Sequence, residues 1–368
     1  MNSSTVTTML PSTCTSKNET IVSHPAATSM GALILSAVFL VGFPGNLFVI
    51  WSILARARKQ SVTTLLILNL AIADGFLMVL TPFFITYLVK MDWTMGNVMC
   101  KILFYLCLAN MYASIYLIML MSLYRLVSVV WPNRISVITG KRTVMRVLGV
   151  VWLLVIIASI PALIFREVKP KGKGAGSVCD SFHDEDREII IQYTLEVVFG
   201  FLIPYGVIVV SYICILRRIR QTKFRRHIRS EHLILAIVLT FCLFWLPYHI
   251  INMVQVSSTL FEKCTTKRTL LDTIWQRSRA VTSTIAFISS CANPVLYFFA
   301  GKSYIRREGL AFMARLFERT GFDSTRKSQM NSQNSRDKDK DAEVVLKDKD
   351  ADSSTNSTSN VKSAKNGK

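Results

Sequence analysis

Charged residues are scarce in this chain. Asp, Glu, Lys and Arg make up 18% of its 368 residues and hydrophobic residues 51%, with the basic residues in short loops and the C-terminal tail. This composition excludes an ordinary water-soluble domain and is typical of a membrane-embedded protein. The net charge is +20, but no basic face interleaved with aromatic residues is found, so a nucleic-acid partner is not expected.

Two further absences exclude classes of function. The last long apolar segment, Ile274–Phe299, contains no lysine, which a retinal-based pump needs in its final helix. The histidines show no spacing with cysteines or acidic residues that would form a metal or catalytic site, so an enzyme is not expected. Those within or after the fourth apolar segment are His183, His227, His232 and His249, and the fifth, His24, lies in the polar N-terminal region.

Seven apolar segments are each long enough to cross a bilayer as a helix. A helix needs about 20 residues to span ~30 Å of hydrocarbon, whereas membrane strands are shorter and alternate in polarity. The segments are Ser29–Leu54, Thr63–Val89, Asn97–Val130, Thr143–Phe165, Ile189–Leu216, Leu233–Val256 and Ile274–Phe299. We therefore predict an all-α membrane protein with a seven-transmembrane helix bundle over residues 29–300.

The regions outside this bundle differ from it in composition. Residues 1–28 are polar, which predicts an outer tail without a cleavable signal peptide and a first helix that acts as its own signal anchor. Residues 301–318 mix apolar and arginine side chains and predict a short amphipathic eighth helix on the inner leaflet. Residues 319–368 are rich in Ser, Thr, Lys and Asp and are expected to be a disordered cytoplasmic tail.

Loop charge predicts the orientation of the chain. Lys and Arg concentrate in the loops after the first, third and fifth segments, and such loops are cytoplasmic in membrane proteins. The N-terminus is then extracellular, and Asn2 and Asn18 begin sequences that are glycosylated on that side. Four cysteines also fall on the oxidising outer side, and we predict the disulfides Cys100–Cys179 and Cys14–Cys264.

Polar residues inside the spans form a second signal, because such residues in a membrane usually have a function. We predict that Asp74, Ser114, Asn293 and the adjacent serines Ser289 and Ser290 converge and that their oxygen atoms hold Na⁺, a hard cation. The alternative is a hydrogen-bonded knot that fixes helix packing.

Prolines inside the spans form a third signal. Each removes a backbone donor and can kink its helix. Phe241 and Trp245 lie one turn apart beside Pro247 and form a candidate hinge, with simple packing as the alternative. The prolines are Pro161, Pro204, Pro247 and Pro294.

These features occur in order along the sequence, and the chain resembles the rhodopsin-like (class A) G-protein-coupled receptors over nearly its whole length. The matching features are Gly45-Asn46, Asp74, Cys100, Arg125, Trp152, Cys179, Pro204 with Tyr212, FxxxWLP from Phe241 to Pro247 and NPxxY from Asn293 to Tyr297. The stretches NMYASIYLIMLMSL, FWLPYHIINM and ISSCANPVLY look like the leukotriene B4 receptors, which are chemoattractant receptors for a dihydroxylated eicosanoid acid.

The resemblance implies a plasma-membrane receptor that couples a lipid-acid agonist to a heterotrimeric G protein, of the Gi family, in chemotaxis and inflammation. Arg125 is then the switch near the cytoplasmic end, with Tyr212, Phe241, Trp245, Pro247, Asn293, Pro294 and Tyr297 in the coupling machinery. Receptor kinases and arrestin are expected to act on the tail. This chain has Tyr124 where the family usually has an acid, so we expect raised ligand-free signalling unless other contacts hold the resting state.

A lipid acid needs a cation for its carboxylate, an apolar slot and polar partners for its hydroxyls. The outer halves of the spans and the resemblance together give six ligand-binding candidates: Tyr112, Arg166, Glu196, Tyr248, Asn252 and Arg279. The arginines have an alternative role in pairing with the acidic second outer loop, and Glu196 in pairing with an arginine. Phe104 stands where a relative carries histidine, which bears on affinity and selectivity. A chemotactic peptide or another eicosanoid is the alternative ligand.

Overall fold

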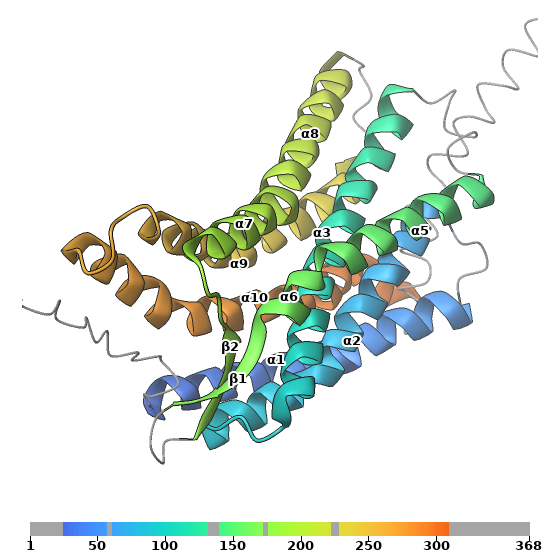
Figure 1. Cartoon of the computed structure of the whole chain (residues 1–368). Helices are drawn as coiled ribbons and strands as arrows, with labels where there is room; N and C mark the ends of the chain where they lie inside the picture. Colours follow the sequence, from blue (N-terminus) through green and yellow to red (C-terminus); the bar gives the residue numbers. More distant parts are fainter. Residues whose placement is uncertain (1–24, 57–60, 132–139, 172–175, 222–227, 309–368) are drawn as a thin grey trace, which may run out of the picture. The chain divides into compact units, whose positions relative to one another are not determined.

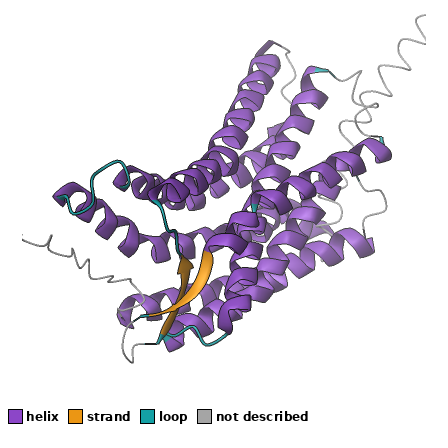
Figure 2. Ribbon diagram, viewed as in Figure 1, coloured by secondary structure: helices purple, strands orange, loops and turns teal. Residues whose placement is uncertain are grey.

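The computed structural model describes residues 25–56, 61–131, 140–171, 176–221 and 228–308 (Figure 1). The described residues are mostly helical, and their strands form one hairpin (Figure 2). The unbroken long helices are α1 (Pro25–Arg56), α2 (Val62–Lys90), α3 (Gly96–Val130), α9 (Ile228–Ser258) and α10 (Thr266–Glu308). The fourth predicted span is α5 (Lys141–Ala158) with α6 (Ile160–Phe165), and the fifth is α7 (Asp186–Val197), η3 (Val198–Leu202) and α8 (Ile203–Gln221).

The prediction of a seven-helix membrane bundle is confirmed. Six helical stretches of the described chain are long and apolar enough to cross a membrane, and α10 contains the seventh predicted span. Helix α10 begins at Thr266 and continues without a break to Glu308, so this helix extends beyond the predicted span at both ends. The rest of the predicted amphipathic helix, residues 309–318, lies outside the described residues.

Helix α3 is the element around which the others are arranged. It contacts α2, α5, α6, η3, α8 and α9, while α1 packs against α2 and α10 (Figure 1). Leu70, Ile115 and Ile237 from three of these helices are fully buried. Leu40, Leu239 and Leu243 point outward with 60% or more of their surface exposed. Exposed leucines are favourable when the surrounding solvent is hydrocarbon, as the predicted spans require.

Prolines account for some of the breaks in the helices. Pro161 lies at the start of α6, where it lacks the amide that would continue α5, and the chain breaks at Ser159. Pro204 is the second residue of α8, which follows directly after η3, a π-helical turn. Pro247 and Pro294 lie inside continuous helices, as do Pro44 and Pro82, which the sequence analysis did not single out.

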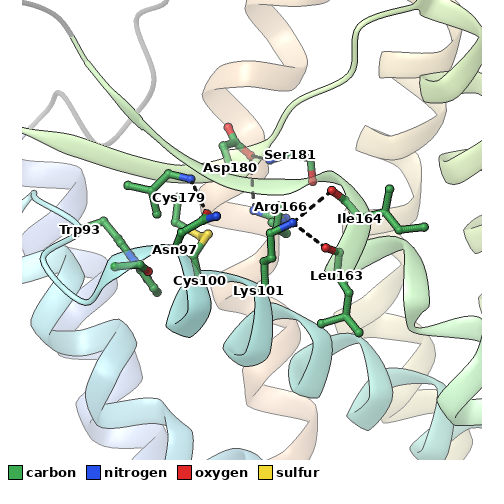
Figure 3. Close-up of a disulfide and its surroundings, with 12 residues drawn as sticks. Trp93, Asn97, Cys100, Lys101, Leu163, Ile164, Arg166, Cys179, Asp180 and Ser181 are labelled. Atoms are coloured by element: carbon green, nitrogen blue, oxygen red, sulfur yellow. Dashed lines mark hydrogen bonds and ion pairs between the residues drawn. A yellow bond between two sulfur atoms is a disulfide. The ribbon is translucent and has the colours of Figure 1, made fainter.

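A hairpin in the second outer loop was not predicted. Strand β1 (Arg166–Pro170) pairs antiparallel with β2 (Ser177–Ser181), and Val168 lies opposite Cys179. Cys179 forms the predicted disulfide with Cys100 at the start of α3, with a Cα–Cα distance of 5.8 Å. The loop is therefore fastened to the outer end of α3 (Figure 3).

Candidate functional site

A connected set of polar side chains joins α7, α9 and α10. We name it the outer polar cluster, and it consists of Glu196, Tyr248, Asn252, Gln255 and Arg279. The Asn252 amide donates a 3.0 Å hydrogen bond to Glu196 Oε1, and Asn252 Oδ1 accepts a 3.0 Å bond from Arg279 Nη1. The Arg279 Nη2 group donates to Gln255 Oε1, and the Tyr248 hydroxyl donates to Glu196. Four of the six ligand-binding candidates thus lie in one network.

Helical spacing explains why these residues meet. Tyr248, Asn252 and Gln255 are separated by four and three residues, so they share one face of α9. Asn252 is fully buried and Glu196 is 3% exposed, and groups buried to this extent need hydrogen-bond partners. Gln255 was missed by the sequence analysis, although its position on the face that carries Tyr248 and Asn252 was visible in the sequence.

The Arg279 guanidinium also lies over aromatic rings. Its Cζ is 4.7 Å from the centroid of the Tyr193 ring and 5.4 Å from that of Trp275. A cation over a ring face is stabilised electrostatically. Asn252 connects Glu196 to Arg279, because its side chain bonds to both, and the pairing of Glu196 with an arginine stays a prediction. Tyr193 was not among the predicted residues.

Arg166 lies at the first position of β1, directly after helix α6, and not inside the fourth helix. Its Nη1 is 3.4 Å from Asp180 Oδ1 on the paired strand, and its Cζ is 3.7 Å from the centroid of the Phe104 ring. Arg166 thus pairs with the acidic second loop, an alternative that the sequence left open (Figure 3). Phe104 supplies a ring face under the cation.

His183, in the loop after β2, lies beside this region. Its ring packs 4.6 Å from the Phe165 ring and 5.8 Å from the Tyr193 ring, between centroids. Nε2 is 2.7 Å from Gln192 Oε1. Burial lowers the pKa of His183, against the opposing effect of the bond to Gln192. The imidazole is therefore neutral at physiological pH.

Tyr112 lies deeper, where η3 approaches α3. A Cβ atom on Gly200 of η3 would come within 2.9 Å of Met111 Cε and 3.3 Å of Tyr112 Cε1. Glycine at this position therefore permits the close approach of the two helices, and π-helical turns often occur at functional sites. Tyr112 is buried and its ring lies 5.8 Å from that of Tyr116. No hydrogen bond between Tyr112 and the outer polar cluster is found in the described part of the chain.

A row of aromatic rings leads inward from the cluster. Tyr248, Trp245, Phe241 and Tyr205 follow one another with centroid separations of 5.7, 5.6 and 6.3 Å. The Trp245 Nε1 group donates a 3.0 Å hydrogen bond to Ser289 Oγ of α10. Phe241 and Trp245, the predicted hinge pair, are stacked as their spacing suggested.

The second polar group surrounds Asp74 of α2. Asn293 Nδ2 donates to Asp74 Oδ2 at 2.8 Å, and Asn110 Nδ2 and Ser114 Oγ donate to Oδ1 at 3.3 and 3.4 Å. Ser290 also bonds to the carboxylate. Ser289, which the sequence analysis grouped with these residues, bonds to Trp245 instead. Asn110 was missed as a member because single-residue register on a helix face is not visible without the neighbouring helices.

Arg125 lies five residues before the end of α3 and is 7% exposed. Tyr212 is half-buried on α8. Several predicted features lie outside the described residues. They are the side chain of Tyr297, the glycosylation candidates Asn2 and Asn18, and Cys14, the predicted disulfide partner of Cys264. Cys264 itself is disulfide-bonded. No cluster of three or more His, Cys, Asp and Glu that could hold a metal ion occurs within the described ranges.

Comparisons with known proteins agree with this geometry. The sequence pattern of the family described as 7 transmembrane receptor (rhodopsin family) matches residues 45–297. Leukotriene B4 receptor 1 of Homo sapiens is 38% identical over 312 residues, which cover 83% of this chain and 87% of that receptor. Leukotriene B4 receptor 2 of Homo sapiens is 34% identical over 311 residues, or 83% and 85% of the two chains.

A relative that is named for a different ligand also matches. The C3a anaphylatoxin chemotactic receptor of Oncorhynchus mykiss is 31% identical over 327 residues, which cover 86% of each chain. These proteins are receptors and not enzymes, and their family is multi-pass in the plasma membrane and coupled to G proteins. On the extent of the family match and on these identities, the chain belongs to the rhodopsin family of seven-transmembrane receptors.

Proposed function

We propose that this receptor binds an oxidised fatty acid, with leukotriene B4 as the first candidate, and signals through Gi in chemotaxis and inflammation. The observation that carries the proposal is the pair of guanidinium groups of Arg279 and Arg166, each held in place by neighbouring side chains. Arg279 belongs to the outer polar cluster, and Arg166 lies on the Phe104 ring beside Asp180. A carboxylate is recognised by such cations, and a hydroxyl by groups such as Asn252, Glu196 and Tyr248.

The test is inhibition of cyclic AMP formation in cells that express the receptor, across a panel of oxidised fatty acids. A response to leukotriene B4 that is lost in Arg279→Ala supports both the ligand class and the carboxylate contact. Surface expression of the variant is measured alongside, because removal of a buried cation can also impair folding. Silence of the wild type across the panel, with the receptor at the surface, would reject the lipid acid.

A chemotactic peptide is the second candidate, and the similarity to the trout C3a receptor favours it. A cationic peptide would interact with Asp180, Glu196 and other outer acids, whereas a lipid acid requires the arginines. Asp180→Asn and Arg279→Ala therefore separate the two ligand classes. Loss of response in the first variant alone would favour the peptide.

The coupling machinery is proposed on the cytoplasmic side. Arg125 would contact the G protein after α9 moves outward, with Tyr212 and Tyr297 completing the active arrangement. Receptor kinases and arrestin would act on the tail.

The proposed orientation has an extracellular N-terminus that carries glycans on Asn2 and Asn18. Antibody access to N- and C-terminal tags in intact cells, with and without glycosidase, tests this orientation.

An allosteric Na⁺ at Asp74 is also proposed. The Asp74 carboxylate and the Ser114 hydroxyl are oxygen ligands that suit a hard cation. Asn110 and Asn293 direct their amide nitrogens at the carboxylate, so each side chain would have to turn its amide oxygen toward the ion to bind it. These residues would hold the ion, whose charge would offset that of the buried carboxylate. A sodium-dependent rise in thermal stability that is absent in Asp74→Asn supports the site, and equal sodium dependence in both proteins would reject it.

A further inference from the structure

The end of the fourth span is held by a side chain from α3. Helix α6 ends at Phe165, and the last carbonyl groups of any helix have no partner within it. The Phe182 amide donates to the Phe165 carbonyl at 2.9 Å. The Lys101 ammonium donates to the Leu163 carbonyl at 2.7 Å and to the Ile164 carbonyl at 3.4 Å (Figure 3).

This contact lies close to Arg166 along the chain and in space. Ile164 is two residues before Arg166, so fixing its carbonyl fixes the start of β1. Lys101 is three residues before Phe104 on α3, which places both side chains on one helix face. The Phe104 ring lies 3.7 Å from Arg166 Cζ. One face of α3 therefore holds the backbone before Arg166 through Lys101 and the guanidinium itself through Phe104.

The other supports of Arg166 come from the hairpin. Asp180 contacts the guanidinium at 3.4 Å and directly follows Cys179, which is bonded to Cys100. Cys100 in turn directly precedes Lys101. The disulfide and the lysine thus fasten the two strands that carry Asp180 and Arg166 to adjacent positions of α3.

We propose that Lys101 is a positioning residue for Arg166: its ammonium group holds the end of α6 so that the Arg166 guanidinium is directed at the carboxylate of the ligand. The inference rests on the proposed function in taking a lipid carboxylate as the group that Arg166 binds. Lys101 acts through the helix end, with its donors already engaged by two carbonyl oxygens. A cation at a helix C-terminus is also favoured by the helix dipole.

The experiment compares leukotriene B4 with its methyl ester, which keeps the chain and hydroxyls but lacks the negative charge. Potency is measured as inhibition of cyclic AMP formation at matched surface expression. Lys101→Met removes the ammonium group and keeps the apolar stem, and it is expected to reduce the potency of the acid about tenfold, the scale of one charge-assisted hydrogen bond. The potency of the ester is expected to stay unchanged, and Lys101→Arg is expected to restore most of the response to the acid.

Two further variants separate positioning from direct contact. In an Arg166→Ala background, Lys101→Met is expected to cause no further loss, because no guanidinium remains to be positioned. Lys90→Met is the matched control, since this exposed lysine lies in the last turn of α2, and it is expected to behave as the wild type. Equal losses for acid and ester, an unchanged response of Lys101→Met, or an independent loss in the Arg166→Ala background would each overturn the proposal.

A measurement without ligand keeps this inference separate from the proposed function. If the wild type does not respond to leukotriene B4, the proposed function fails, and the Lys101 contact is then judged by thermal unfolding of the purified receptor. Lys101→Met is expected to lower the melting temperature less in an Arg166→Ala background than in the wild type. Additive effects of the two substitutions would overturn the structural coupling between Lys101 and Arg166.

Discussion

An exchange of the carboxylate and the amide at positions 196 and 252 tests the outer polar cluster. The variants are Glu196→Gln, Asn252→Asp and the two combined. In the wild type, Asn252 donates to Glu196 and accepts from Arg279, each at 3.0 Å, and both residues are almost fully buried. The double variant keeps one carboxylate, one amide and one guanidinium, so the same groups are present in exchanged places.

The expected free energies of unfolding follow from these contacts. Asn252→Asp places a second carboxylate beside Glu196 and removes a hydrogen-bond donor. One of the two buried carboxylates then has no compensating cation, and such a charge lowers the free energy of unfolding by about 3–5 kcal/mol. Glu196→Gln removes a charge-assisted hydrogen bond, which costs about 1.5–3 kcal/mol. The combined variant restores the charge balance and lets the new carboxylate at position 252 bond directly to Arg279. We expect the double variant to be more stable than Asn252→Asp alone, with a coupling energy of about 2 kcal/mol or more.

Thermal unfolding of the purified receptor in detergent, without agonist, measures these differences. Glu185→Gln is the control, because it makes the same chemical change at an exposed residue, where a shift within about 0.5 kcal/mol is expected. If the costs of the two single substitutions simply add, Glu196, Asn252 and Arg279 do not form one electrostatic unit, and the reasoning is refuted.

Three other substitutions test separate parts of the structure. His249→Phe is expected to raise the melting temperature of the ligand-free receptor, because neither imidazole nitrogen has a hydrogen-bond partner among the described residues and each buried, unsatisfied group costs about 1–3 kcal/mol. A lower melting temperature would show that the imidazole nitrogens have hydrogen-bond partners in the purified receptor. Replacing Cys100 and Cys179 together by alanine is expected to destabilise the receptor by about 4–5 kcal/mol, given their separation of 79 residues, as measured by the same unfolding assay. Tyr124→Asp is expected to lower ligand-free G-protein signalling, read as basal cyclic AMP, and an unchanged basal level would contradict the resting role given to an acid there.

The sequence predicted the helices well because the membrane imposes a length and a composition on each span. The breaks were harder to predict. Pro161 was recognised as a disrupting residue, and the fourth span is divided beside it. Pro204 lies two residues after the wide turn η3, but this proline does not predict how closely Gly200 approaches Met111 and Tyr112 of α3. Such a contact belongs to the assembled bundle and is absent from the local sequence.

In the candidate site, too, some residues could be recognised from the sequence and others only from the assembled bundle. Glu196, Asn252 and Arg279 were singled out because they lie in the outer halves of the spans and match pocket positions of the family that the chain resembles, and the structure joins them. Lys101 was overlooked because lysines are common at the outer ends of membrane helices. Only the folded structure shows that its ammonium group bonds to the Leu163 carbonyl. Ser289 and Ser290 were both assigned to Asp74, but Ser290 bonds there while Ser289 bonds to Trp245, because one residue on α10 is a rotation of about 100°.

Trp245 is the residue at which the two polar groups of this receptor meet. Its ring lies 5.7 Å from that of Tyr248, which bonds to Glu196 in the outer polar cluster. Its Nε1 group, the single donor of the side chain, bonds to Ser289 at 3.0 Å, and the adjacent Ser290 bonds to Asn110 and Asp74. The indole therefore connects the outer polar cluster to the residues around Asp74 through one ring contact and one hydrogen bond, so a displacement of either neighbour acts on the same side chain.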